Sequence, residues 1–227
     1  MNDLKRMKEF YSNRDQDAWS VFNCYPFILD SKQTFMLTKI LNNVNLTKIK
    51  LLDIGAGEGN FILKMISLGI KPKNIVAVEY LENRYEKLVE KLSHIRSLNA
   101  DFLDVNLNEK YELITLMAVL TSITDNNLRY TILNKAVDSL EEGGMLIIYD
   151  YFDDNERFLT ENYRALSLKK VKKLPKRYSV VVHKNVYIKS LYAKILCKLR
   201  LQSLVSFVES LKIFNDSYHF VVITYEK

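Results

Sequence analysis

Apolar residues along this chain follow two spacings that alternate through most of its length. Short, almost continuous apolar runs, typical of buried strands, occur at 49–54, 74–79, 111–117 and 145–149, with a weaker one near 97–100. Patterns typical of helices lie between or beside these runs, at 61–68, 82–92 and 126–140. Buried strands that alternate with helices predict an α/β fold with a parallel sheet covered on both faces.

The two ends of the chain have a different pattern. Residues 178–182 and 218–225 are predicted as strands with helix over 188–212 between them, and in the N-terminal 1–45 only 35–46 is predicted as helix. No internal repeat, low-complexity segment or flexible linker interrupts the 227 residues. The sequence therefore predicts a single domain.

Composition narrows the class of protein. A hydrophobic content of 48% and a charged content of 26% are typical of soluble globular proteins, and no apolar run approaches the roughly 20 residues of a membrane span. The first twenty residues contain no apolar signal region, so a cytoplasmic location is expected. Cys24 and Cys197 form no metal-ligand or redox pattern, and we interpret each as a small buried hydrophobic residue in a reducing compartment.

Charge is unevenly distributed along the chain. Residues 169–227 contain 13 basic and 3 acidic residues, a net charge of +10, whereas residues 1–168 carry a net charge of −4. A dense basic cluster within this part consists of Lys169, Lys170, Lys172, Lys173, Lys176 and Arg177. The cluster predicts an anionic partner on that side of the molecule, and the alternative is an ordinary solvated surface.

Glycine is rare in this chain, so we expect it where the backbone conformation requires it. Five of the six glycines fall at two places, Gly55, Gly57 and Gly59 and then Gly143 and Gly144. The first group lies between a predicted strand and a predicted helix. Such a turn brings backbone N–H groups and a helix N-terminus against a ligand, and sites for NAD, FAD and S-adenosylmethionine (SAM) all use it.

Two details of this turn favour SAM. Asn60 stands where the dinucleotide fingerprint requires glycine or alanine. Asp53 precedes the turn and Glu58 lies within it, where carboxylates would repel a pyrophosphate. SAM has no phosphate but carries an ammonium and a sulfonium, so acidic residues here fit a cationic ligand. Glu79 and Asp101, each at the end of a predicted strand, are suited to the ribose hydroxyls and to the adenine, with Phe102 beside the adenine ring.

With these residues in place, 48–152 resembles the class I SAM-dependent methyltransferases. The match rests on the motif at 51–61, on Glu79 and Asp101, and on the glycine turn at 141–144. The resemblance implies a Rossmann-like sheet of seven strands, mostly parallel, with helices on both faces and the last strand antiparallel. It also implies that 1–45 forms a lid over SAM, with Tyr11, Trp19, Phe22 and Tyr25 as its aromatic residues, and that 153–227 lies on the acceptor side. Plain packing of those aromatic residues under the sheet is the alternative.

The resemblance assigns roles to individual residues around the cofactor. The methionine part of SAM would be held by Asp53, Gly55, Ala56, Gly57 and Gly59. The ribose would be held by Glu79 next to Tyr80, and the adenine by Asp101 and Phe102. The end of the fourth strand would line the site with Met117, Ala118 and Val119.

The stretches 117–125 and 149–151 resemble a bacterial branch associated with surface-polysaccharide biosynthesis. Segment 115–125 lacks the proline motif of enzymes that methylate amino groups of nucleic acids, neither cysteine lies near the site, and no metal-ligand cluster follows the fourth strand. We therefore expect an O-methyltransferase acting on a sugar hydroxyl of a nucleotide-linked or phosphorylated glycan precursor, without a metal. Another small metabolite or RNA as acceptor, and a SAM-binding protein without catalysis, are the alternatives.

Methylation of a hydroxyl needs a general base to remove its proton. The first candidate is Asp150 at the end of the fifth predicted strand, the second is His183 at the end of the sixth, and the third is Asp125. Each also has a structural interpretation: a turn cap for Asp150, a partly buried surface residue for His183, and a helix N-cap for Asp125. The base is therefore left open at this stage, as is the oligomeric state.

Overall fold

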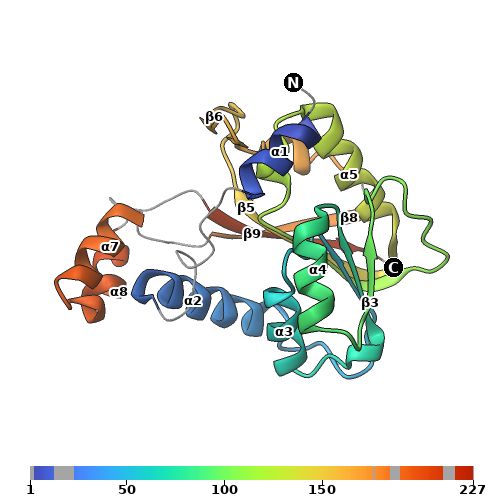
Figure 1. Cartoon of the computed structure of the whole chain (residues 1–227), viewed down its shortest axis with the longest axis horizontal. Helices are drawn as coiled ribbons and strands as arrows, with labels where there is room; N and C mark the ends of the chain where they lie inside the picture. The colour runs from blue at the N-terminus through green and yellow to red at the C-terminus, as the bar shows by residue number, and fades with distance from the viewer. Residues whose placement is uncertain (1–2, 13–22, 176, 185–189, 212–217, 227) are drawn as a thin grey trace.

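A computed structural model describes residues 3–12, 23–175, 177–184, 190–211 and 218–226. Its centre is a seven-stranded sheet in the order β3-β2-β1-β4-β5-β9-β8 (Figure 1). The strands are β1 (Leu51–Ile54), β2 (Ile75–Glu79), β3 (Arg96–Asn99), β4 (Tyr111–Met117), β5 (Leu140–Tyr151), β8 (Tyr178–Lys184) and β9 (Tyr218–Tyr225). β1 to β5 are parallel, and β9 runs antiparallel to both β5 and β8. This architecture confirms the predicted Rossmann-like fold.

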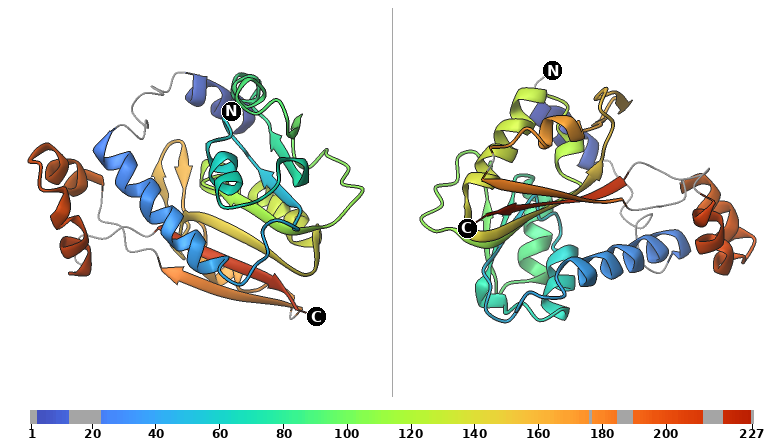
Figure 2. Two further views of the ribbon diagram at one scale, coloured as in Figure 1. Left: turned by 90° about the horizontal axis from the view of Figure 1, so that it is seen from below. Right: turned by 180° about the vertical axis from the view of Figure 1, so that it is seen from behind.

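Helices cover both faces of the sheet (Figures 1 and 2). The larger ones are α1 (Asp3–Ser12), α2 (Cys24–Ile40), α3 (Asn60–Ser67), α4 (Glu82–Lys91), α5 (Asn126–Asp138), α7 (Ser190–Lys198) and α8 (Val205–Ser210). α2, α3 and α4 pack on one face through Leu37, Met65 and Leu88, and α5 packs on the other. Consecutive residues of β1, Leu51 and Leu52, point to opposite faces of the sheet and so into the two separate cores.

The strand predictions at 111–117 and 218–225 agree with β4 and β9. The predicted helix 126–140 was too long, because α5 ends at Asp138 and β5 begins at Leu140. A bulge in β5 then separates two paired segments, since Leu140 pairs with Tyr111 but Met145 pairs with Leu113. Apolar periodicity starts only after this bulge, which explains why the start of β5 was missed.

Both predicted terminal helices differ from the structure. The prediction of 188–212 as helix was wrong in its middle, where Arg200 has a φ of +58° and separates α7 from the 3-10 turn Gln202–Leu204 and α8. The prediction of 35–46 captured only the second half of α2, which starts at Cys24 and ends at Ile40. Proline at position 26 is tolerated there because it lies in the first turn of the helix.

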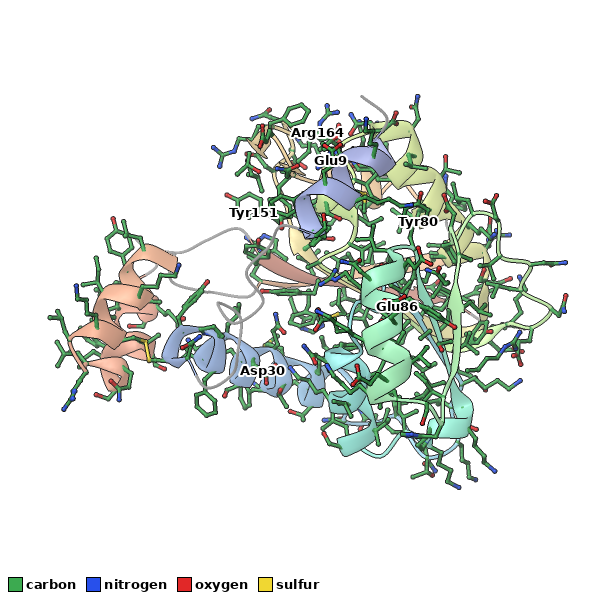
Figure 3. All side chains as sticks on the ribbon, in the orientation of Figure 1. Glu9, Asp30, Tyr80, Glu86, Tyr151 and Arg164 are labelled. Atoms are coloured by element: carbon green, nitrogen blue, oxygen red, sulfur yellow. A yellow bond between two sulfur atoms is a disulfide. The ribbon has the colours of Figure 1, made fainter. Side chains whose placement is uncertain are left out.

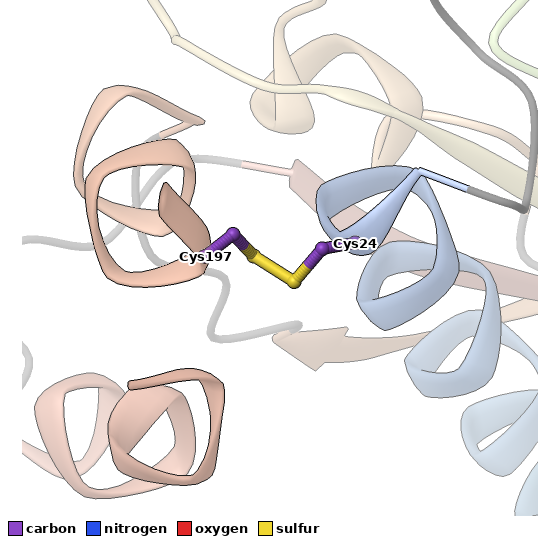
Figure 4. The surroundings of a disulfide bond; sticks show 2 residues. All are labelled: Cys24 and Cys197. Atoms are coloured by element: carbon purple, nitrogen blue, oxygen red, sulfur yellow. A yellow bond between two sulfur atoms is a disulfide. The ribbon is translucent and has the colours of Figure 1, made fainter. Parts of the chain in front are cut away.

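The two cysteines are bonded to each other (Figure 4). Cys24 is the first residue of α2 and Cys197 lies in the last turn of α7, with their Cα atoms 6.0 Å apart. The interpretation of each cysteine as an isolated buried hydrophobe was therefore wrong, because a sequence separation of 173 residues hides a contact that only the fold makes. Disulfides persist in oxidising environments, so this pair gives no support to a reducing compartment, and the cytoplasmic location stays a prediction.

The segment after β5 is held against α5. It contains a hairpin of β6 (Phe158–Thr160) and β7 (Tyr163–Arg164) and a single helical turn, α6 (Leu168–Val171), none of which the apolar pattern predicted. Glu156 anchors it, accepting from Arg129 at 3.0 Å and from the Tyr130 hydroxyl at 2.7 Å. Lys170 donates to the same carboxylate.

The described part of the chain contains no helix with the length and apolar character needed to cross a bilayer.

Candidate functional site

A cavity of about 1090 Å³ opens at the carboxyl ends of β1, β2, β4 and β5. Ligands of open α/β sheets bind at this edge, where the strand order reverses between β1 and β4. α1 and α2 contribute the opposite wall through Met7, Tyr11, Tyr25 and Asp30. Figure 3 labels two of the residues that line the cavity, Asp30 on α2 and Tyr80 just beyond β2. Trp19 and Phe22, also predicted for the lid, lie outside the described residues.

The glycine turn after β1 forms the floor of the cavity. Gly55 and Gly57 have φ angles of +71° and +58°, in the left-handed region that side chains disfavour. The Gly55 N–H donates to the carbonyl of Val78 at 2.8 Å, which fixes the turn against β2. A Cβ on Gly55 would lie 2.6 Å from Val119 Cγ2, so the turn also requires glycine for the close approach of the chain after β4.

Gly59 has a different role from the other two glycines. It is the N-cap residue of α3 with a φ of +80°, and it does not line the cavity. A Cβ there would lie 2.7 Å from Leu88 and 2.8 Å from Leu92, both around the end of α4. Gly59 therefore allows helix α3 to pack closely and positions the turn only indirectly. The other eleven residues predicted to contact the cofactor all line the cavity.

Asp53 and Glu79 are two buried carboxylates at the ends of neighbouring strands. Asp53 accepts from the Thr115 hydroxyl at 2.6 Å across the β1–β4 pair, and burial raises its pKa to about 7, with the nearby Glu79 adding to the rise. Glu79 accepts from the N–H of Gly57 at 2.7 Å and from that of Leu81 at 2.8 Å. A carboxylate has about four acceptor positions, so Glu79 retains capacity for ligand hydroxyls.

The predicted adenine side lies beyond β3. One oxygen of Asp101 accepts from the Leu103 N–H at 2.9 Å, and the side chain is only partly buried. Phe102 is buried in the core beneath α5, with Lys135 Nζ 5.0 Å from its ring centroid. Lys135 also donates to the carbonyl of Phe102, which holds this loop in place.

Ala118 carries an unusual backbone conformation at the end of β4. Its φ is +58°, a region that non-glycine residues rarely adopt, and its N–H donates to the Tyr149 carbonyl at 2.7 Å. Strained residues of this kind cluster at functional sites, where the surrounding structure holds them. Here the chain turns at Ala118, and Met117, Ala118 and Val119 line the cavity.

The three candidate bases lie in very different places. Asp150 is fully buried and lines the cavity; its Oδ2 accepts from the Leu120 N–H at 3.0 Å, and Oδ1 has no partner among the described residues. Burial raises the pKa of Asp150 to about 8. Asp125 caps α5 by accepting from the Leu128 N–H at 3.0 Å, and His183 lies on the edge strand β8. Neither Asp125 nor His183 lines the cavity.

None of the described residues of the basic cluster lines the cavity, contrary to the expectation that the cluster lies beside it. Lys169, Lys170 and Arg177 form ion pairs with Asp154, Glu156 and Asp138, respectively. The first two pairs attach α6 to the segment after β5, and the third attaches the residue before β8 to the last residue of α5. β8 runs in the same direction as β5, so its first residues lie at the end of the sheet opposite the cavity. Lys176 lies outside the described residues.

Several cavity residues gave no signal in the sequence. Arg84 lies on α4 with its guanidinium carbon 4.6 Å from the centroid of the Tyr11 ring, so it joins α4 to α1 at the cavity wall. Lys64 on α3 donates to Asp30 on α2 at 2.7 Å across the cavity wall. Lys64 and Arg84 are the cationic residues among the described residues that line the cavity. The sequence predicted the helices that contain Lys64 and Arg84, but which side of each helix faces the cavity depends on helix packing.

The strand order and the position of the cavity are those of the class I methyltransferase fold. Solved structures of methyltransferases have a similar fold. The N-methyltransferase NodS from Bradyrhizobium japonicum WM9, in complex with S-adenosyl-L-homocysteine, has a TM-score of 0.68 and 16% identity over 99% of each chain. Magnesium protoporphyrin IX methyltransferase (ChlM) from Synechocystis PCC 6803, with bound SAM, has a TM-score of 0.64 and 10% identity over 100% of this chain and 98% of that one. A StiE O-MT segment has a TM-score of 0.55 and 16% identity, covering 86% and 74%.

At the level of sequence, no family model and no curated protein matches this chain. The structural similarity therefore establishes the fold.

Proposed function

We propose that this protein is a SAM-dependent methyltransferase acting on a small molecule. The observation that carries the proposal is the pair of buried carboxylates, Asp53 and Glu79, on either side of a turn with positive φ angles. Two buried acids raise each other's free energy unless a cation compensates them. Asp53, beside the turn, fits a ligand with an ammonium better than one with a pyrophosphate, whereas Glu79 would suit the ribose of either.

The residues that would hold the cofactor follow from their positions. Asp53 and the turn at Gly55 and Gly57 would bind the methionine part, Glu79 the ribose hydroxyls, and Asp101 the adenine edge. SAM supplies a methyl group already activated by its sulfonium. The chain therefore has to align the acceptor with that methyl group and exclude water, which the wall formed by α1 and α2 would do.

Asp150 is the proposed general base. Its Oδ1 is buried at the cavity without a partner within the described residues, and its pKa of about 8 lies near neutral pH. The N–H groups that hold Oδ2 fix the carboxylate in one orientation. An acceptor hydroxyl hydrogen-bonded to Oδ1 would lose its proton to this oxygen as the bond to the methyl carbon forms.

For the acceptor we propose a sugar hydroxyl. The support is the resemblance to the bacterial branch and a cavity wall rich in tyrosine, which suits the apolar faces of a sugar ring; the lining tyrosines are Tyr11, Tyr25, Tyr80, Tyr149, Tyr163 and Tyr218. A phosphate or nucleotide on that sugar would have to meet Lys64 or Arg84. Structurally similar enzymes include both N- and O-methyltransferases, so the methylated atom is part of the test.

Two measurements test the proposal. Calorimetry should give at least micromolar affinity for SAM and S-adenosylhomocysteine and far weaker binding of NAD; the reverse order would overturn the cofactor assignment. Glu79→Ala should weaken SAM binding by about 1–3 kcal/mol, with Glu79→Gln losing less because it keeps one acceptor oxygen.

The acceptor is tested by a screen with labelled SAM against sugar nucleotides, phosphosugars, neutral sugars, amines and RNA. Methylation of sugar hydroxyls is expected, and Lys64→Gln should raise KM for a phosphosugar more than for its neutral sugar. Turnover with amines or RNA alone would reject the sugar proposal. No turnover with any acceptor would favour a SAM-binding protein without catalysis.

A further inference from the structure

α7, the 3-10 turn Gln202–Leu204 and α8 form a small unit at one end of the molecule, away from the central sheet (Figures 1 and 2). Its inner side packs on α2, where Ala193 and Val205 contact Tyr25 and Ile28. The disulfide and an ion pair between Lys32 and Glu209 fasten it to the same helix. Its attachment is therefore specific, although the buried part is small.

The outer side of this unit is strongly apolar. Of the thirteen exposed large hydrophobic residues in the described part of the chain, eight lie between positions 191 and 211. They recur at helical spacing, and their exposed fractions reach 64%: Leu191, Ile195 and Leu199 in one series, and Leu201, Leu204, Phe207 and Leu211 in the next. Exposed apolar residues concentrated in this way mark an interaction site more often than a plain surface.

The charges on the same unit all have one sign at its surface. Lys194, Lys198 and Arg200 are exposed and form no ion pair among the described residues. The Lys194 ammonium lies 6.0 Å from the centroid of the Tyr25 ring, so its side chain borders α2. The one acidic residue at 190–211, Glu209, is buried and paired with Lys32. An apolar surface with basic residues at its margins is typical of helices that lie in the interface of an anionic membrane.

We propose that this α7–α8 surface, formed by the seven apolar residues of the two series with Lys194, Lys198 and Arg200, docks on the headgroup region of an anionic lipid bilayer. Leu, Ile and Phe side chains would enter the boundary between headgroups and acyl chains, and the lysines would reach the phosphates with their long stems along the apolar surface. The lysines and Arg200 would attract the unit to the negative surface over about a Debye length.

A second copy of the chain fits this surface less well. Two copies meeting through it would bring Lys194, Lys198 and Arg200 against their own counterparts, with Glu209 buried and unavailable for compensation. Like charges opposed across an interface disfavour association. The charge of this surface therefore favours an extended anionic partner over a second copy of the same surface.

Sedimentation of the full-length protein with large vesicles tests the proposal. Binding to mixed phosphatidylglycerol–phosphatidylcholine vesicles is expected, with much weaker binding to phosphatidylcholine alone and a fall in binding as salt is added. Leu199→Asp combined with Phe207→Asp should weaken vesicle binding at least tenfold. Lys194→Gln and Lys198→Gln should each weaken it about fivefold, the effect expected for one basic residue near an anionic surface.

Phe35→Asp is the matched control, because Phe35 is 59% exposed on α2 and Phe207 is 64% exposed on α8. It should leave vesicle binding unchanged, and circular dichroism should show that all variants keep their fold. Equal binding of the parent and the Leu199/Phe207 variant, or no binding to anionic vesicles, would overturn the proposal. A dimer of the parent in sedimentation velocity that is lost in the Phe207→Asp variant would assign the surface to a second copy instead.

Discussion

Gly55, Gly57 and Gly59 have similar backbone angles but different neighbours, so their substitution should have different consequences. At Gly55 the obstacle is Val119 across the cavity floor, at Gly59 it is the end of α4, and at Gly57 the nearest atom to a Cβ, in Arg84, is 3.5 Å away. Only Gly55 and Gly59 combine an unfavourable φ with a steric conflict. The spacing of three glycines in the sequence conceals this difference.

Gly55→Ala should weaken SAM binding at least tenfold, because the left-handed conformation costs alanine about 1–2 kcal/mol and its Cβ conflicts with Val119. Adding Val119→Ala should recover the steric part of the loss. Gly69→Ala is the control, since Gly69 has a φ of +114° but its nearest neighbour is 4.0 Å away and it lies outside the cavity. Calorimetry on the three variants measures this; equal effects at Gly55 and Gly69 would contradict the steric argument.

SAM affinity should depend on pH through Asp53. Its raised pKa of about 7 means that the carboxyl is increasingly protonated below neutrality, and a protonated carboxyl does not attract an ammonium. We therefore expect the affinity to increase as pH rises from about 6 to about 8, with proton release on binding. Asp53→Asn should bind more weakly and lose this dependence. A parent protein with a flat profile would remove Asp53 from the ammonium site.

At the scale of elements, α2 joins three parts of the structure. Leu37 packs in the core beside the sheet, Tyr25 and Asp30 line the cavity, and Cys24 is bonded to α7. Lys64 of α3 holds the helix through Asp30. A movement of α7 and α8 would therefore reach the cavity through one helix.

The non-reduced protein should yield a peptide pair linked through Cys24 and Cys197 in mass spectrometry. Cys24→Ser should lower the free energy of unfolding by about 2–4 kcal/mol under non-reducing conditions, because the bond closes a long loop in the unfolded chain. Cys197→Ser should have the same effect, and the double variant should not add to it. Additive losses would mean that the two sulfurs act separately.

For the whole molecule, Asp53 and Asp150 link stability to pH. Burial holds both pKa values, about 7 and about 8, above the ordinary value of 3.8, so the folded chain favours their protonated forms. The stabilisation that comes from these raised pKa values is fully present below about pH 4, and it is lost as pH rises through 7 to 8.

The free energy of unfolding of the ligand-free protein should therefore fall from about pH 5 to about pH 8 more steeply than that of Asp150→Asn. Urea denaturation at several pH values measures the two slopes, and parallel slopes would show that Asp150 does not titrate differently in the folded chain. Added SAM should restore stability most at the higher pH, because binding favours ionised Asp53.

The sequence by itself determined the alternation of strands and helices that builds the sheet, and it located one wall of the cavity. β1, the glycine turn, Glu79 and the end of β4 are local features, because buried strands are apolar and tight turns require glycine. Strand ends in a parallel sheet also meet at one edge, which is why eleven predicted residues line one cavity.

Only the tertiary structure decided the rest. Three kinds of contact join distant segments: the bond between Cys24 and Cys197, the contact of Tyr11 with Arg84, and the ion pairs of Lys169 and Lys170. Asp150, His183 and Asp125 were ranked in that order as candidate bases, each with a structural alternative. Packing separates a helix cap and an edge-strand histidine from a buried carboxylate at the cavity. Periodicity reports which face of an element is apolar, but the partner of that face depends on how the elements pack.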